Sequence, residues 1–516
     1  MGTAKWWTFV VSLFALLDAG ALSERASAAD RRLTQSEVES WFDHTLVDGL
    51  GRNLPVRPNV HVTEFIDGDD TFRAMNRRIS RVAGVDSYIY LLNWWVDDTF
   101  PLVADLPDTT LFKLLKNASD SGVEIRGMFW HQVTPPNHKV QNLTQVENIN
   151  NLPYGSAILD NKTRKFGSHH QKVLIIYDAA IDELVAFCGG IDFNRDRVYP
   201  QGTSGSAQKG APDHDVHCML VGPAAWDLLQ IFRVRWADHP LRASLPTSPI
   251  NKQRLTGIRL PRNIEATIKP DHKQWAQVGH TYPPLGPSAY TQWYDFAPRG
   301  EQTARAIILH AIARATNYIY LEDQYMVSPE ASGALQAALI KNPKLQLIIL
   351  IPDPSLTDPQ PFYKDHQARF LAPLKSVAKD RVRVYVLDNT NNLHSYVHSK
   401  TWIFDDEFAI IGSANCNSRS WTYDSEVVVG ICDPGNGVNQ RMPHRLRVGL
   451  WSEHLNIPKN ELDDWSTALA RWIHPPPGHH IRRYIDSVNN RRPLRLQRWL
   501  DGVWNKEIDP NAGPLH

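Results

Sequence analysis

A short pattern of histidine, any residue and lysine occurs twice in this chain, each time at the start of an apolar run. The second copy reads HSKTWIFDDEFAIIGSANCNSRS and the first reads HHQKVLIIYDAAIDELVAFCGGIDFNRDR. A Gly-rich turn with polar residues follows each run, GGID at 189–192 and GSAN at 412–415. One such pattern on a strand means little. Two copies with matching flanks predict one site assembled from two half-sites.

The two copies differ by one residue in the spacing that follows the lysine. The positions are His398, Lys400 and Asp405 in the second copy and His170, Lys172 and Asp178 in the first. Only the second copy keeps the strict spacing H-x-K-x4-D. Because side chains alternate along a strand, each lysine is expected on the same face as its histidine.

The segments before the motifs repeat as well. Residues 71–95 predict an amphipathic helix followed by a strand, and residues 303–326 repeat that order, with SYIYL answered by NYIYL. A second helix and strand follow in each half, at 111–130 and 334–353. Alternating helices and near-continuous apolar strands predict an α/β fold in which each half has a sheet buried between helices.

The repeat divides the chain into segments with expected boundaries. Residues 134–166 are expected to be a long polar loop that borders the mouth of the site. The expected segments are a signal peptide (1–28), an N-terminal segment (29–59), a first half (60–245), a linker (246–284), a second half (285–470) and a C-terminal extension (471–516).

The N-terminus predicts export. Lys5 precedes the apolar run WWTFVVSLFALL, and the small residues Ala26-Ser27-Ala28 follow, which is typical of a secretory signal peptide cleaved after Ala28. The run is shorter than the roughly 20 residues of a membrane span, although an uncleaved anchor is the alternative. We therefore expect a secreted protein that is soluble or peripheral after cleavage.

Charge, sequons and cysteines restrict the function further. Lys+Arg and Asp+Glu both number 55, so no overall basic charge favours nucleic acid. Sequons at Asn117, Asn142 and Asn161 are expected glycan sites on surface loops if the host is a eukaryote, and chance matches in a bacterium. The four cysteines favour buried free thiols, while a secreted context permits one or two bridges.

The motifs, with their flanks, resemble those of the phospholipase D superfamily. Residues 213–227, YLEDQY (320–325) and LRVGLWSEHL (446–455) are similar to segments of phospholipase D proper, and the resemblance covers most of 60–470. It implies a pseudo-twofold bilobal fold of two similar α/β halves, each a mixed sheet flanked by helices. It also implies hydrolysis of phosphatidylcholine-like lipids to phosphatidic acid and a free alcohol, with possible transfer to other alcohols.

The residue types suit phosphodiester chemistry. A neutral histidine can attack phosphorus, and a protonated one can donate to the leaving oxygen. Lys172 and Lys400 are expected to hold the non-bridging oxygens, with Ser413 and Asn415 as further donors. The resemblance implies that His170 forms a phosphohistidine and that His398 is the general acid and base. The symmetry of the two motifs leaves that order open.

The resemblance also implies supporting residues. Asp215 and Glu426 are expected to orient the histidine of the opposite half, as a carboxylate does in a triad. Asp178 and Asp405 look like structural supports of the strands, and Asp192 stands where many members have asparagine.

Other nearby side chains have two readings. His169 is expected to help shape the pocket. Four further histidines could line the pocket or serve in packing, and tryptophans near the motifs could contact acyl chains or a choline head as well as fill the core. The histidines are His131, His214, His217 and His394, and the tryptophans include Trp94, Trp95 and Trp130.

The scheme requires no metal or other cofactor, and calcium dependence stays open. The expected partner is a phospholipid membrane surface. Nucleic acid is disfavoured, and no obligate protein partner is implied. The alternatives are a secreted or lumenal nuclease of the same fold and an inactive phospholipid-binding scaffold. The Pro-, Arg- and Trp-rich stretch after Trp472 could bind anionic lipid heads, although a helix with a solvated basic face is the favoured reading.

Overall fold

The computed structural model describes most of the chain. The described residues are 32–131, 138–164, 166–198, 212–245, 273–284, 294–353, 360–387, 396–484 and 501–509. The predicted signal peptide lies outside them. Within the described residues no helix is long and apolar enough to span a bilayer.

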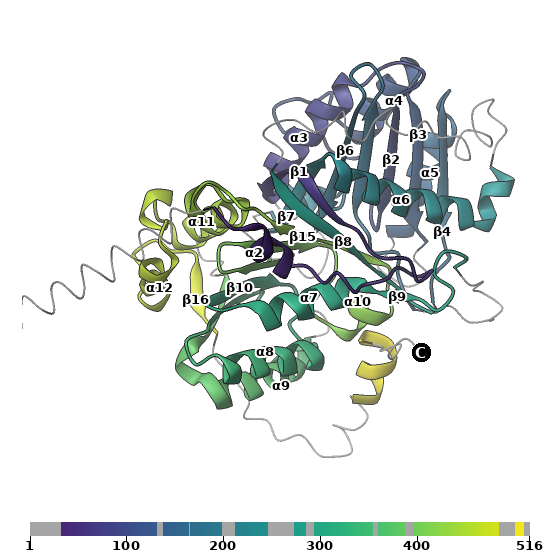
Figure 1. Ribbon diagram of the computed structural model, residues 1–516. Coiled ribbons are helices and arrows are strands. Elements are labelled where there is room, and N and C mark those ends of the chain that lie inside the picture. The colour runs from purple at the N-terminus through teal and green to yellow at the C-terminus, as the bar shows by residue number, and fades with distance from the viewer. Residues whose placement is uncertain are drawn as a thin grey trace, which may run out of the picture.

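One sheet runs through both halves of the molecule (Figure 1). From the first half to the second, its strands are β4 (Gly155–Asp160), β3 (Glu124–Trp130), β2 (Tyr88–Asn93), β5 (Val173–Asp178), β6 (Glu183–Gly189), β7 (Val216–Val221), β1 (Val56–Ile66), β8 (Gln274–Tyr282), β15 (Glu426–Cys432), β14 (Phe408–Gly412), β13 (Lys400–Phe404), β10 (Tyr318–Asp323), β11 (Gln346–Ile351), β12 (Val382–Leu387) and β16 (Ile481–Arg483), and β9 (Glu301–Gln302) pairs with β8.

The strand order is the same when read outward from the centre in either direction. β1 and β8 pair antiparallel in the middle, and each half then continues with two antiparallel strands before its motif strand, β5 or β13. Beyond the motif strands, β2–β3–β4 and β10–β11–β12 run parallel. The expected pair of similar α/β halves with mixed sheets is therefore confirmed, and β16 is an addition to the second half.

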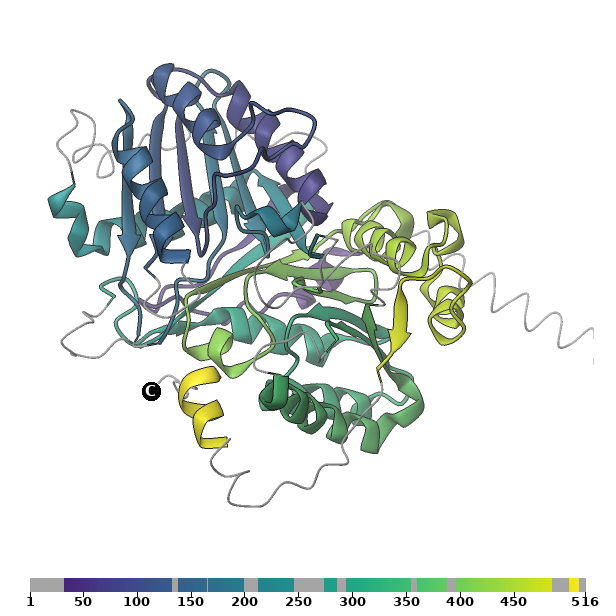
Figure 2. The same ribbon diagram turned by 180° about the vertical axis from the view of Figure 1, so that it is seen from behind.

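Helices cover both faces of the sheet (Figures 1 and 2). One apolar cluster continues across both halves beneath α6, α11 and α12. On the opposite face, α3, α4 and α5 cover the first half and α7, α8 and α9 cover the second. The α-helices are α2 (Gln35–Ser40), α3 (Asp67–Arg81), α4 (Leu111–Asp120), α5 (His138–Asn150), α6 (Pro223–Asp238), α7 (Thr303–Arg314), α8 (Pro329–Lys341), α9 (Gln360–Ala378), α10 (Ser418–Thr422), α11 (Met442–Leu455) and α12 (Trp465–Ile473).

The described residues also contain single turns of other helix types. Five are 3-10 turns and one, near the C-terminus, is a π-helical turn: Arg195–Arg197, Pro240–Ser244, Lys379–Arg381, Val438–Gln440, Lys459–Glu461 and, as the π-helical turn, Trp504–Ile508.

The motif strands are buried on both faces, which explains their continuous apolar sequence. In β5, Val173 and Ile175 point into the cluster beneath α6, whereas Leu174 and Ile176 point to the opposite face. This alternation holds the strand in one register, because a slip by one residue would exchange the two faces. The ends of the motif strands are thereby fixed in space.

Two stretches differ from the sequence expectations. The segment expected to be one long loop contains helix α5 and strand β4. The helix was missed because only two of its few apolar residues, Val146 and Ile149, anchor it in the core. Strand β8 lies within the range assigned to the linker and pairs with β1 and β15, so the second half extends into that range.

A buried ion pair ties α11 to the turn after the second motif strand. Arg447 Nε and Nη2 donate to the two carboxylate oxygens of Asp406 at 2.7 and 3.0 Å, and neither side chain is exposed by more than 2%. The Tyr318 hydroxyl donates to the same carboxylate at 2.7 Å. Asp406 has a φ of +57°, which asparagine tolerates as well.

We expect Asp406→Asn to lower the free energy of unfolding by about 3 kcal/mol, because it leaves the Arg447 guanidinium buried without its counter-charge. Arg445→Gln, on the same helix, removes an exposed pair with Glu64 and should cost less than about 1 kcal/mol. Urea unfolding of both variants measures the difference. Equal losses would contradict this account of α11.

Candidate active site

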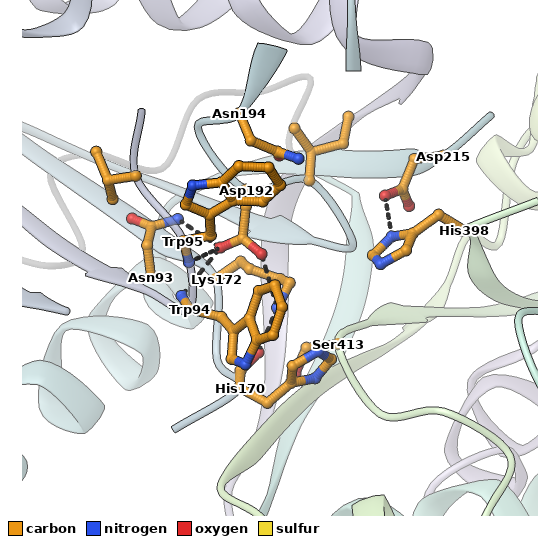
Figure 3. A network of polar contacts seen from close by, with 12 residues as sticks. Asn93, Trp94, Trp95, His170, Lys172, Asp192, Asn194, Asp215, His398 and Ser413 are labelled. Carbon is orange, nitrogen blue, oxygen red and sulfur yellow. Dashed lines mark hydrogen bonds and ion pairs between the residues drawn. The ribbon is translucent and has the colours of Figure 1, made fainter. Parts of the chain in front are cut away.

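Each motif histidine contacts a carboxylate from the opposite half. His170 Nδ1 lies 3.0 Å from both carboxylate oxygens of Glu426. His398 Nδ1 lies 2.7 Å from Asp215 Oδ2, a contact visible in Figure 3. The predicted pairing of carboxylate and opposite histidine is therefore present in the structure. With Nδ1–H donated to a carboxylate, each ring keeps Nε2 for chemistry.

Backbone hydrogen bonds hold both contacts in place. His170 N donates to Ser425 O at 2.9 Å, and His398 N donates to His214 O at 2.8 Å. Ser425 and His214 are the residues directly before the two carboxylates. Each motif thus runs alongside the segment that supplies its carboxylate, and the two halves exchange these contacts symmetrically.

Both site histidines are held neutral. Burial lowers the pKa of His170 well below its ordinary value, and the charges of Lys172 and Lys400 lower it further. Burial also lowers the pKa of His398, with Arg197 and both lysines adding to the effect. Since both lysines act on both rings, the four groups share one electrostatic site. A bound phosphate anion would offset these positive charges and raise both pKa values.

Ser413 supports a carboxylate. Its hydroxyl donates to Glu426 Oε2 at 2.5 Å and is buried, so the expectation that Ser413 would donate to a phosphate is not supported by its position. Burial raises the pKa of Glu426 to about 8. Glu426 is therefore a weaker anion toward His170 than an ordinary carboxylate would be. Asn415, the other expected donor, is also buried.

The two lysines differ in their partners. Lys172 Nζ donates to His170 O at 2.8 Å and pairs with Asp192 Oδ2 at 3.1 Å. Lys400 Nζ also donates to the carbonyl of its own histidine, but its other polar neighbours are the Gln324 amide oxygen at 3.3 Å and His398 Nδ1 at 3.0 Å. Burial lowers the pKa of Lys400 to about 7.

A carboxylate and an amide exchange places between the halves. The first half has Asn93 at the end of β2 and Asp192 in the Gly-rich turn, whereas the second has Asp323 at the end of β10 and Asn415 in its turn. Asp192 accepts hydrogen bonds from the backbone of Trp94 and Trp95, and Asp323 accepts from Tyr325, Met326 and Cys416. Each half therefore keeps one acid at this junction, but only Asp192 reaches its lysine.

An aromatic wall stands beside His170. The Trp94 ring meets the His170 ring edge to face at 5.9 Å and stacks on Trp130 at 5.5 Å, and Lys172 Nζ lies 5.7 Å from the Trp94 ring centre. Figure 3 shows Trp94 and Trp95 on the side of Lys172 and Asp192.

Asn142 holds this wall and was misread from the sequence. Its amide donates to Trp94 O and Trp130 O at 2.9 Å each and accepts from Val96 N at 2.8 Å, and it is fully buried. The expected glycan at Asn142 is therefore wrong for the folded chain, whereas the other two sequons, at Asn117 and Asn161, are exposed. No sequence pattern marks Asn142 as a support of the site.

A buried charged network lies behind His398. His214 contacts Asp67 at 2.8 Å through Nδ1 and Glu322 at 2.9 Å through Nε2, and His454 Nε2 lies 2.8 Å from Glu322. These carboxylates raise the pKa of His214 well above its ordinary value, against the effect of burial. His214, Glu322 and His454 are of metal-ligating types, but each ring nitrogen already meets a different oxygen of Glu322. The geometry is that of a hydrogen-bonded charge network that fixes the residue before Asp215.

A second network lies behind His170. Asp160 accepts from Arg235 and lies 3.1 Å from His169, and Arg235 Nη1 donates to the Ser425 hydroxyl at 2.9 Å. His169 is thus a buried neighbour that braces the motif. Sequence reasoning missed Asp160 and Arg235, because neither lies in a motif.

The remaining candidates lie outside the site or in its support. Asp178 and Asp405 lie at the far ends of β5 and β13, about 20 Å and about 17 Å along the strands from Lys172 and Lys400. Asp405 accepts three backbone N–H bonds there, from Thr316, Asn317 and Tyr318. His131 is half-buried, and His394 lies outside the described residues.

All four cysteines are buried and free, as favoured from the sequence. Cys188 and Cys218 are cross-strand partners in β6 and β7, close to the Gly-rich turn of the first half.

Comparisons with known proteins cover both halves. A family model described as "Cardiolipin synthase, PLD-like domain" matches residues 308–445. Phospholipase D alpha 1 of Brassica oleracea var. capitata is 24% identical over 569 residues, covering 78% of this chain and 68% of that protein. Phospholipase D alpha 2 of Arabidopsis thaliana is 24% identical over 560 residues, covering 80% and 68%.

Among solved structures, the crystal structure of phosphatidylserine synthase from Haemophilus influenzae Rd KW20 is similar with a TM-score of 0.53 and 15% identity. The match covers 87% of this chain and 94% of that one. At this identity the similarity concerns the fold alone.

Acid should weaken the fold through His217, which packs under the Gly-rich turn and accepts from Ile191 N at 3.3 Å. Burial lowers its pKa to about 3, so between pH 6.5 and pH 3 the unfolded chain binds a proton that the folded chain does not. Stability from this group is complete above about pH 6.5 and falls by about 1.4 kcal/mol per unit as the pH drops.

Between pH 7 and pH 5 the free energy of unfolding should fall in the parent protein. We expect this fall to be about 2 kcal/mol smaller in His217→Gln. Urea unfolding at both pH values measures this. His44→Gln serves as the control, because His44 is exposed and should leave the pH dependence unchanged. An unchanged pH dependence in His217→Gln would rule the effect out.

Proposed function

Because this chain belongs to the phospholipase D superfamily and is a phosphodiesterase of that type, we propose that it hydrolyses phosphatidylcholine-like phospholipids to phosphatidic acid and a free head-group alcohol. Transfer of the phosphatidyl group to an added alcohol is a side reaction of the same site. We also propose that the protein is secreted before it acts, because the apolar run near its N-terminus is typical of a signal peptide. The names of the curated relatives support the lipid substrate.

The crossed histidine–carboxylate contacts carry this proposal. Two rings, each with Nδ1 at a carboxylate, share one site with two lysines. This arrangement supplies a nucleophile, a proton donor and positive charge for the phosphate oxygens, which are the requirements for phosphodiester cleavage.

In the first step, Nε2 of His170 attacks phosphorus. The bound phosphate raises the pKa of His398, so that this ring takes up a second proton, on Nε2. A P–N bond then forms while the P–O bond to the head group breaks, and the proton on Nε2 of His398 goes to the leaving alkoxide. Lys172 and Lys400 stabilise the charge on the non-bridging oxygens.

In the second step, His398 takes a proton from water, and the water oxygen attacks phosphorus. A P–O bond forms, the P–N bond breaks, and His170 returns to its neutral state with phosphatidic acid released. An alcohol in place of water gives the transfer product, since either can donate its proton to His398.

The two carboxylates favour this assignment of roles. Asp215 Oδ2 lies 2.7 Å from His398 Nδ1, so a carboxylate directly supports the charge of the His398 ring, which must carry a proton in the first step. Glu426, with its pKa raised to about 8, gives an imidazolium at His170 less support. His170 therefore suits the neutral nucleophile and His398 the acid.

The decisive experiment incubates the purified protein with phosphatidylcholine vesicles and a little ethanol, and measures phosphatidic acid and phosphatidylethanol by mass spectrometry. We expect both products, and loss of both in His170→Ala and His398→Ala, because each variant lacks one of the two proton or phosphoryl carriers. His474→Ala, an exposed histidine, should keep activity.

Other outcomes redirect the assignment. Cleavage of bis-p-nitrophenyl phosphate without lipid products would mean that the site is active on another diester, and cleavage of single-stranded DNA would favour the nuclease. Lipid binding without turnover, unchanged in His170→Ala, would favour the inactive scaffold.

We expect Asp215→Asn to lower kcat at least about 100-fold with little change in KM, since an amide cannot stabilise the charged His398 ring. Glu426→Gln should lower kcat less, because its partner, His170, acts as a neutral ring. Asp178→Asn, at the far end of β5, is the control and should stay within about twofold. A larger loss in Glu426→Gln than in Asp215→Asn would reverse the assigned roles.

A further inference from the structure

A cavity of about 550 Å³ opens at the outer edge of the second half. It lies between β12, β16 and the end of α12. Figure 1 shows β16 and α12 on the side of the second half that faces away from the first half. β16 is four strands away from β13, which begins at Lys400, or about 20 Å across the sheet. The cavity is therefore separate from the crossed histidines.

The cavity is lined by basic side chains. Arg383 and Tyr385 are two residues apart on β12, and Arg483 is the cross-strand partner of Tyr385, so all three point to the same side of the sheet. Lys379 lines the cavity from the turn before β12, and Asp380 is the one acidic residue among its lining residues.

Lys379, Arg383 and Arg483 share Asp380 as the one carboxylate of the cavity lining. Arg383 Nη1 donates to the neutral Gln346 amide at 2.7 Å, and no ion pair joins Lys379, Arg383 or Arg483 to a carboxylate in the described part of the chain. Burial lowers the pKa of Arg383, and the charge of Arg483 adds to that effect. Two guanidiniums that repel each other inside a cavity are stabilised by an anion between them.

The walls restrict the kind of anion. Four cations and one carboxylate line the cavity, and one of the cations, Arg482, is paired with Asp353 outside the lining. Two positive charges are therefore uncompensated, which matches a phosphomonoester near neutral pH. Tyr385 and Trp472 form an apolar wall with their ring centres 5.0 Å apart. Ile473 lies beside them and is 46% exposed, so an apolar side chain stands at the rim.

We propose that this cavity binds a phosphomonoester group. Arginine forks bind phosphate oxygens in pairs, and the cavity volume is within the range of small-ligand sites. The group can belong to a lipid or to a soluble phosphate ester. Phosphatidic acid is the proposed lipid ligand, and this choice rests on the proposed function. By binding it, the cavity would hold the enzyme on a membrane that already contains its product.

The test measures binding without turnover, in the full chain carrying His398→Ala. Binding to phosphatidylcholine vesicles with and without phosphatidic acid is followed by co-sedimentation, and inorganic phosphate is added as a competitor. We expect tighter binding when phosphatidic acid is present, and a loss of about tenfold or more in Arg383→Gln/Arg483→Gln, as expected for charge-assisted hydrogen bonds.

Arg445→Gln/Arg471→Gln is the matched control, since it removes the same charge from exposed ion pairs on α11 and α12. Equal loss in both double variants, or no loss in the cavity variant, overturns the proposal. If the cavity variant fails to fold, Lys379→Gln, an exposed position, must weaken binding for the proposal to stand.

The competitor separates the two sources. Displacement by inorganic phosphate supports a site open to soluble phosphate esters, and binding that phosphate does not displace supports the lipid source. If phosphatidic acid does not tighten vesicle binding and inorganic phosphate does not compete, the proposed site is overturned. If the protein fails to hydrolyse lipid, the binding test still stands, because it is made in the inactive His398→Ala variant.

Discussion

The exchange of carboxylates between the halves is the constraint on which the site depends. His170 needs Glu426, and His398 needs Asp215, so neither half holds a complete pair. The antiparallel pairing of β1 with β8 joins the halves into one sheet, and the backbone contacts at Ser425 and His214 fix the exchange. Much of the surrounding structure, including the Asp160 and Glu322 networks, serves to hold these segments at hydrogen-bond distance.

Symmetry in the backbone coexists with asymmetry in charge. The exchange of acid and amide at Asn93/Asp192 and Asp323/Asn415 leaves Lys172 paired, whereas no carboxylate of the described residues lies within ion-pair distance of Lys400. Burial brings the pKa of Lys400 to about 7, so its charge responds strongly to an arriving anion. Two halves with the same fold thus give their lysines different charge environments, which suits the proposed two-step reaction.

The fold and the crossed contacts were within reach of the sequence, because a duplicated motif and its apolar flanks carry both the strand order and the pseudo-twofold relation. The supporting residues were not. Asn142 looked like a surface sequon, and only its three backbone contacts reveal its role. Ser413 looked like a phosphate donor, but its direction depends on where Glu426 lies. Asp160, Arg235 and His454 act through long-range contacts that no local spacing encodes.

The crossing of the contacts also sets an order in time. The partners of the two pairs are separated by 256 and 183 residues along the chain. During synthesis the first half emerges with His170 but without Glu426, and with Asp215 but without His398. A nascent chain therefore carries no finished site until most of its length has left the ribosome. The separate halves are therefore inert toward any phosphodiester, and the site can first act when translation is nearly complete.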